Sequence, residues 1–160
     1  MLRETLGIVK SQKSQVSSHE LKLPFGYISK QIPNKWRKRM AAIRNFEEIQ
    51  SWQKARYLTK NLYKTTSTGD FAKDFGLRDQ IRRASVSIMA NIAEGFGRHS
   101  DKEFANFLNI AQASASEVQS HLYVALDLEY INQEKFDIFY KLLDEISRMI
   151  YAFAQHLRKS

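Results

Sequence analysis

The sequence has no cysteine, little proline or glycine and no long apolar run, and each absence excludes a class of protein. Without cysteine, the 160-residue chain forms no disulfide and no thiolate metal site. Its apolar runs are far shorter than the roughly 18 residues of a membrane span, and no signal-peptide pattern follows them. We therefore expect a cytoplasmic protein with no membrane association.

The prolines and the charges divide the chain into two unequal parts. Both prolines, Pro24 and Pro33, lie near the N-terminus, beside a Ser/Gln-rich stretch with no sustained helical period. The segment before Met40 contains nine of the 25 Lys and Arg residues and two of the 17 Asp and Glu residues, a net charge of +7. The rest of the chain therefore carries +1 of the total net charge of +8. We predict a flexible basic N-terminal arm over residues 1–43 and one nearly neutral domain over residues 44–160.

The arm contains a dense basic run with one aromatic residue, suited to base stacking or to a membrane surface. Alternatively, the run is a leader without function. Met40 stands directly before the body, so translation that starts there would remove the arm, and the sequence leaves both starts open. The residues of the run are Lys35, Trp36, Arg37, Lys38 and Arg39.

Apolar residues recur at helical spacing in four segments of the body. Four helices joined by short turns predict an all-α, up-down-up-down four-helix bundle. The expected core stripes are Phe46, Ile49, Trp52, Leu58 and Leu62; Leu77, Ile81, Ala84, Ile88 and Ile92; Phe104, Phe107, Leu108, Ala111, Ala115, Val118, Leu122 and Ala125; and Phe136, Phe139, Leu143, Ile146, Ile150, Phe153 and Leu157.

Capping patterns predict where these helices begin. Asn45, with Glu48 three residues on, is expected to start the first helix. A loop over residues 65–76 then leads to the second helix. Ser100 and Glu103 match the Ser-x-x-Glu capping box of the third, which is expected to be the longest. The fourth helix follows a break at residues 130–132.

Three segments carry a resemblance to a known family: NFEEIQSWQKAR at 45–56, QIRRASVSIMANIAEGFGR at 80–98 and KEFANFLNIAQASASEVQ at 102–119. They resemble the four-helix bundle family of 23S rRNA intervening-sequence proteins, and the likeness covers residues 44 to 158. Members of that family typically have a proline where this chain has Met89. The local helix distortion that a proline causes is therefore not expected at Met89. The fine geometry of an interface at this position is not inferred from the family.

The resemblance implies a small bacterial cytoplasmic protein that assembles as a homo-oligomeric ring, expected to be a pentamer. Some members of the family are encoded within insertions in large-subunit rRNA genes. More distantly, the chain is similar to accessory proteins of diversity-generating retroelements, which associate with a reverse transcriptase and nucleic acid. RNA or DNA, a protein partner and further copies of the chain are thus the expected partners.

The densest basic group of the body is the candidate nucleic-acid site, because the planar guanidinium of arginine suits phosphate contacts. The alternative is ordinary pairing on a helix surface, since Asp79 precedes Arg83 by four residues. The candidate residues are Arg78, Arg82, Arg83, Arg98 and Lys102.

Beyond its core stripe, the second helix has an apolar flank that includes Val86, and the third has Ile110, Val124 and Leu128 outside its stripe. Such flanks indicate contact with a second subunit, or else a wide core in a monomer. Small and polar residues are the candidates for a network between helices or subunits: Ser87, Asn91, Glu94, Ser114 and Glu117.

No residue pattern requires catalysis, a cofactor or a metal. Glu117 and His121 are four residues apart and form a single Glu-x-x-x-His pair. A di-metal site in a helix bundle instead uses Glu-x-x-His, with three-residue spacing, on two helices. The leading hypothesis is a non-enzymatic oligomeric bundle that binds structured RNA or other nucleic acid through repeated basic patches. The alternatives are a protein-interaction scaffold or accessory subunit of a separate nucleic-acid-processing enzyme and, third, a bundle enzyme with a buried metal.

Overall fold

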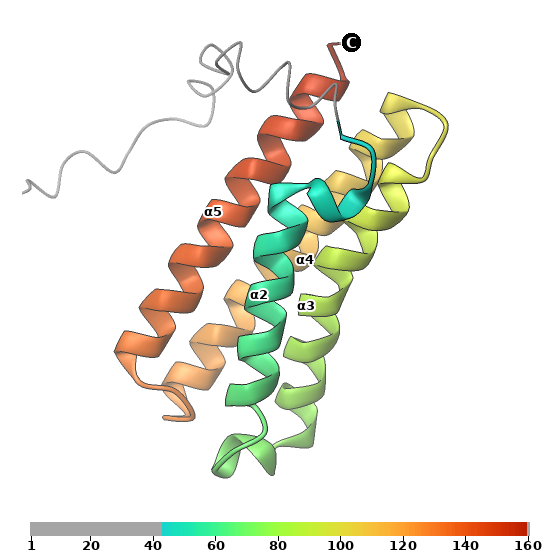
Figure 1. Ribbon diagram of the computed structural model, residues 1–160. Coiled ribbons are helices and arrows are strands. Elements are labelled where there is room, and N and C mark those ends of the chain that lie inside the picture. Colours follow the sequence, from blue (N-terminus) through green and yellow to red (C-terminus); the bar gives the residue numbers. More distant parts are fainter. Residues whose placement is uncertain (1–42, 160) are drawn as a thin grey trace, which may run out of the picture.

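The computed structural model describes residues 43–159, and all of the regular structure in this range is helical. Four long helices run alternately up and down around one core (Figure 1), which confirms the predicted all-α four-helix bundle. They are α2 (Gln50–Thr65), α3 (Phe75–Phe96), α4 (Asp101–Asp127) and α5 (Gln133–Leu157), with short 3-10 helices η2 (Phe46–Glu48) and η3 (Asp70–Ala72).

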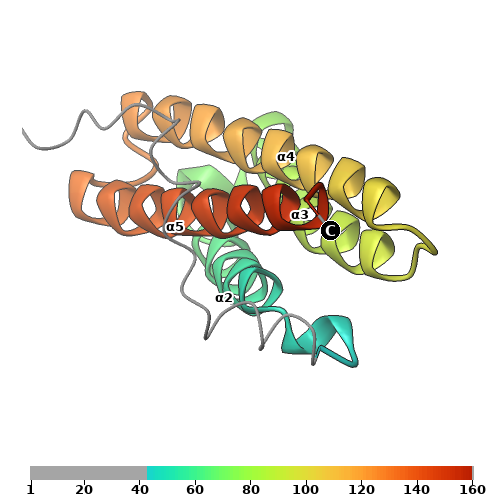
Figure 2. The ribbon, with the colours of Figure 1, turned by 90° about the horizontal axis from the view of Figure 1, so that it is seen from above.

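Each helix packs on two neighbours. Helices α2 and α4 lie opposite each other, and both pack on α3 and on α5. Figure 2 shows this arrangement from above, with α2 and α4 on opposite sides of the bundle. The outward face of α2 therefore points away from α4. The predicted arm, with its basic run at 35–39, lies outside the described residues.

The core is built from about one buried side chain per helical turn, as the apolar spacing predicted. In α5 every expected core residue is buried except Leu157, which is partly buried. Small residues on α4, among them Ala111, Ala115 and Ser114, face the α3 side or the core and keep this helix thin. Gly95 near the end of α3 serves the same close approach, since a Cβ atom there would lie 2.6 Å from Cδ2 of Phe104.

The predicted N-cap of the third helix is confirmed, although the Glu103 carboxylate accepts from the Ser100 hydroxyl and not from its backbone N–H as in a full capping box. The Ser100 hydroxyl accepts a hydrogen bond from the Glu103 backbone N–H at 3.2 Å and donates one to the Glu103 carboxylate at 3.0 Å. The helix that follows has 27 residues and is the longest of the described part of the chain. The break before α5 also lies where it was expected, with Asn132 as the N-cap.

The predicted start of the first helix is wrong. Residues 46–48 form η2, α2 begins only at Gln50, and Asn45 makes no side-chain cap. The Glu48 carboxylate accepts instead from the Arg44 N–H at 3.3 Å. Ile49, which lies between the two helices with an extended backbone, is buried in the core. η2 packs on both α2 and α3, and this tertiary contact accompanies the break in the helix.

Two loops meet at the lower end of the bundle in Figure 1 and fix the start of α3. Asp74 caps this helix by accepting from the Leu77 N–H at 2.9 Å, so α3 begins at Phe75 and the loop is slightly shorter than predicted. The Tyr130 hydroxyl donates to the other carboxylate oxygen of Asp74 at 3.3 Å, and its ring stacks on Phe71. Desolvation, followed by the Asp74 carboxylate, raises the pKa of Tyr130.

Candidate nucleic-acid interface

The five basic residues that the sequence singled out lie in two groups at opposite ends of α3. Arg78 and Arg82 are in its first two turns, whereas Arg98 and Lys102 lie around the turn into α4. Twenty residues of α-helix span about 30 Å, so Arg78 and Arg98 cannot form one compact patch. Arg83 lies beside the first group on an exposed position.

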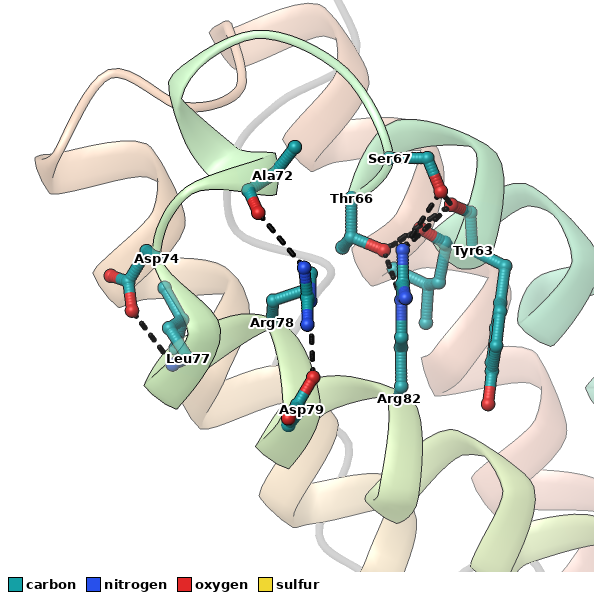
Figure 3. A network of polar contacts seen from close by, with 10 residues as sticks. Tyr63, Thr66, Ser67, Ala72, Asp74, Leu77, Arg78, Asp79 and Arg82 are labelled. Atoms are coloured by element: carbon teal, nitrogen blue, oxygen red, sulfur yellow. Dashed lines mark hydrogen bonds and ion pairs between the residues drawn. The ribbon is translucent and has the colours of Figure 1, made fainter.

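Arg78 and Arg82 hold the α2–α3 loop in place (Figure 3). Arg78 donates to the Ala72 carbonyl at 2.9 Å and pairs with Asp79 at 3.0 Å. Arg82 donates from Nε to the Thr66 hydroxyl at 2.7 Å. A guanidinium committed to such bonds has few donors left for a phosphate, so these two arginines serve the fold first.

Arg82 makes two further contacts, one with Tyr63 of α2 and one with Ser67, two residues after the end of that helix. Its Nη2 donates to the Ser67 hydroxyl at 2.8 Å, and its guanidinium lies over the Tyr63 ring at 4.7 Å from the centroid. The ring and the guanidinium therefore form one exposed, positively charged stack at the α2–α3 seam.

The second group is only partly committed. Arg98 forms an ion pair with Glu94 one turn earlier and lies over the Phe107 ring. Lys102 and Arg83 are exposed, and neither forms an ion pair or hydrogen bond with any residue between 43 and 159. Of the five predicted residues, these two present the freest cations within the described structure.

Three of the five predicted network residues meet between α3 and α4. The Asn91 amide donates to the Ser87 hydroxyl at 3.0 Å, and the Ser87 and Ser114 hydroxyl oxygens lie 2.9 Å apart. Because Ser114 donates its proton to the Ile110 carbonyl at 3.1 Å, Ser87 is the donor to Ser114. The network thus joins two helices of one chain.

The other two predicted network residues are paired elsewhere. Glu94 pairs with Arg98, and Glu117 lies 3.5 Å from Nε2 of His121. Within residues 43–159, no cluster of three or more His, Cys, Asp or Glu side chains has the arrangement of a metal site. None of the described helices combines the length and the apolar character needed to cross a membrane.

The sequence reasoning missed a basic face on α2. This helix contains Lys54, Arg56, Lys60 and Lys64 but no Asp or Glu. Lys54 is neutralised by Glu145 of α5 at 3.0 Å, whereas the other three have no carboxylate within ion-pair distance among the described residues. The sequence itself shows that residues 50–65 contain no Asp or Glu. This local excess of positive charge was missed because the net charge of the whole body is close to zero.

Exposed aliphatic side chains lie outside the core on α3 and α4 and are called the apolar flank, with Val86 on the α2 side of α3. Val86, Ile110, Val124 and Leu128 are 42–50% exposed, as their positions outside the core stripes predicted. The last three share one side of α4, where Glu117 and His121 lie between them. Exposed aliphatic side chains in one row are typical of a surface that another protein covers.

The fold and the sequence together define a class and a family. The bundle is an all-α, four-helix protein with an exposed apolar flank. The family description 23S rRNA-intervening sequence protein matches residues 47–152, and the chain belongs to this family. Among curated proteins, none matches the chain.

A solved structure supports the same assignment. It is the crystal structure of a protein with unknown function from the S23 ribosomal protein family of Bacteroides thetaiotaomicron, which is similar to this chain at 30% sequence identity with a TM-score of 0.60. The similarity covers 66% of this chain and 98% of that one. The part outside the match corresponds in size to the predicted arm and the chain ends, so the family fold is the bundle itself.

Proposed function

We propose that this protein is a non-enzymatic, oligomeric four-helix bundle of the bacterial cytoplasm that binds nucleic acid, in particular structured RNA. Membership of a family described by 23S rRNA intervening sequences supports a link to RNA. The observation that carries the proposal is the outward face of α2, where Arg56, Lys60 and Lys64 are exposed and unpaired among the described residues. Such a face neutralises phosphates and releases counterions.

Of the original candidate residues, Arg83 and Lys102 lie on α3 and α4 and add free positive charge outside the α2 face. Arg78, Arg82 and Arg98 also contribute positive charge. Their hydrogen bonds and the ion pair of Arg98 with Glu94 stabilise the bundle as well. Substituting them therefore alters stability and binding together, whereas Lys60 and Lys64 test binding by itself.

Self-association would multiply this surface. The exposed apolar flank of α3 and α4 supports an interface between copies of the chain, and a pentameric ring would present each basic face five times. Several weak phosphate contacts that act together raise the apparent affinity without any new contact. The proposed homo-oligomer thus gives a near-neutral body a strongly basic array.

The test is RNA binding at several salt concentrations, with the full chain compared with a shortened chain that begins at Met40. Binding by the shortened chain, with an affinity that falls steeply with salt, supports the proposal. The Lys60→Gln/Lys64→Gln variant should then bind more weakly. If binding disappears with the arm, the bundle is not the binding element and the proposal fails.

A second candidate function is a protein-interaction scaffold or accessory subunit for a separate nucleic-acid-processing enzyme. The uncovered apolar flank favours it, because a partner protein would bury Ile110, Val124 and Leu128 as well as a second copy does. Co-purification of a defined protein partner that survives nuclease treatment would distinguish the scaffold from direct RNA binding.

A further inference from the structure

The outward face of α2 has aromatic rings beside its cations, of which Tyr57 and Tyr63 are exposed and Trp52 is partly buried against the core. On a helical wheel at 100° per residue, Trp52 and Tyr63 lie on one edge of the face formed by the three cations, and Tyr57 lies on the other edge, beside the two lysines. Aromatic residues interleaved with cations are the composition of surfaces that bind unpaired bases as well as phosphates.

Two of the three rings have a structural role. Trp52 packs edge-to-face on Phe46 at 5.1 Å between centroids and lies under Arg56 at 5.8 Å. Tyr63 lies under Arg82. Both rings are therefore explained, at least in part, by packing at the η2 end and at the α2–α3 seam.

Tyr57 has no comparable explanation. Its side chain is 63% exposed, and it makes no ring contact or side-chain hydrogen bond with any residue between 43 and 159. It lies one residue after Arg56 and three before Lys60, in the middle of the helix. A rigid, uncovered ring between unpaired cations is suited to stacking on a flat ligand that carries negative charge.

We infer that the outward face of α2 binds unpaired nucleotides, with the Tyr57 ring stacked on a base and the neighbouring cations on the phosphates. The cations Arg56, Lys60 and Lys64 rise by about 6 Å from one to the next along the helix, so the row spans about 12 Å and a few nucleotides. This inference rests on the proposed function and narrows it to single-stranded segments or loops.

The chemistry distinguishes unpaired nucleotides from a duplex. In a double helix the faces of the bases are covered by their stacked neighbours, so a side chain on a convex helix surface reaches only phosphates and groove edges. The cations alone would serve a duplex, whereas Tyr57 contributes only where a base is splayed out. Unpaired bases in the loops of a structured RNA meet this requirement.

One carboxylate of the neighbouring helix α5 is placed against α2. Glu145 pairs with Lys54 at 3.0 Å, so its charge is balanced on the protein. The row from Arg56 to Lys64 keeps its positive charge for a phosphate backbone.

The experiment measures binding of the full chain to a 20-nucleotide oligo(U), to oligo(dT) of the same length and to a 20-base-pair RNA duplex. Tyr57→Leu removes the ring and keeps an apolar side chain, and Tyr57→Phe keeps the ring. Tyr123→Leu removes a half-exposed tyrosine from the opposite helix α4, where its ring packs on Phe136 and Tyr140, and serves as the control for loss of a tyrosine away from α2. We expect Tyr57→Leu to weaken oligo(U) binding about tenfold and to leave duplex binding unchanged. Tyr57→Phe and Tyr123→Leu should bind as the unaltered protein does.

Lys60→Gln/Lys64→Gln separates this inference from the proposed function. It should weaken binding to all three probes and reduce the salt slope for oligo(U) by about 1.4, for two phosphate contacts on a single strand. Stacking by Tyr57 is overturned if the lysine variant binds more weakly while Tyr57→Leu binds oligo(U) with unchanged affinity. It is also overturned if the unaltered protein binds the duplex as tightly as oligo(U). In both cases the proposed function stands. If no probe binds, both fail. Equal affinity for oligo(U) and oligo(dT) would show that the site accepts both RNA and DNA. A higher affinity for one of them would identify RNA or DNA as the preferred ligand.

Discussion

The Nε atom of Arg82 lies 2.7 Å from the hydroxyl oxygen of Thr66, sixteen residues earlier in the chain. Thr66 is fully buried at the end of α2, and its hydroxyl donates to the Leu62 carbonyl at 2.8 Å. The hydroxyl is therefore satisfied as donor and as acceptor only while Arg82 is present. This arginine, which its sequence context marks for phosphate binding, is also a structural link between α2 and α3.

Arg82→Ala should consequently destabilise the bundle by about 1–2 kcal/mol, because a charge-assisted hydrogen bond to a buried group is lost. Urea unfolding, followed by circular dichroism, measures the change. Arg83→Ala is the control, since Arg83 is exposed and should alter the free energy of unfolding by less than about 0.5 kcal/mol. Equal stability of the two variants would show that the Arg82–Thr66 bond contributes nothing.

Gly95→Ala should destabilise the protein although alanine is the better helix former. The gain in propensity is about 1 kcal/mol, but the new methyl group would lie 2.6 Å from Phe104 and 2.7 Å from Phe107. Relieving that overlap moves α3 and α4 apart and should leave a net loss of about 1–3 kcal/mol. Thermal unfolding checks this result.

Gly97→Ala is the matched control for this position. A Cβ atom at Gly97 meets nothing closer than the Glu94 carbonyl at 3.5 Å, and its backbone is already in the helical region. We expect its melting temperature to be unchanged or slightly higher. A stable Gly95→Ala protein would mean that the two helices are not in the close contact described.

Ile88→Asp should unfold the bundle. Ile88 is fully buried in the middle of α3, and no cation lies within the core to pair with a new carboxylate among the described residues. The cost is several kcal/mol, comparable to the whole stability of a small domain. Ala90→Asp, on an exposed position of the same helix, should remain folded, and circular dichroism distinguishes the two. A folded Ile88→Asp protein would show that the helical phase of α3 is wrong.

The fold was predictable because its signals are local. The stripe from Phe136 to Phe153 and the N-cap at Ser100 depend on residues three or four apart, which the sequence shows directly. The start of the first helix was not predictable in this way. The 3-10 turn at residues 46–48 packs on α2 and α3, and such tertiary contacts cannot be read from residues three or four apart.

The candidate site was predicted less well, for two physical reasons. The partners of Arg82 are Tyr63 in the last turn of α2 and Thr66 and Ser67 in the loop that follows, whose path only the tertiary structure shows. The basic face of α2 was concealed because charge was summed over the whole body rather than along one helix. Net charge describes long-range attraction, whereas a binding surface depends on which cations share a face and lack a carboxylate.

Val124→Asp should dissociate the proposed oligomer without unfolding the chain. Val124 is 42% exposed on the apolar flank of α4, so a carboxylate there remains solvated in a monomer but would be buried in an interface between copies. Sedimentation or light scattering should show the unaltered chain as an oligomer, expected to be a pentamer, and the variant as a smaller species. Circular dichroism of the variant should show the same helical content.

Ile138→Asp is the control for this prediction. Ile138 is 57% exposed on α5, which is not one of the two helices that carry the flank, and the variant should keep the mass of the unaltered protein. If Ile138→Asp dissociates the oligomer and Val124→Asp does not, the interface lies on α5 instead. If the unaltered chain is monomeric at micromolar concentration, the apolar flank does not join copies of this protein, and a different protein becomes the expected partner for Ile110, Val124 and Leu128.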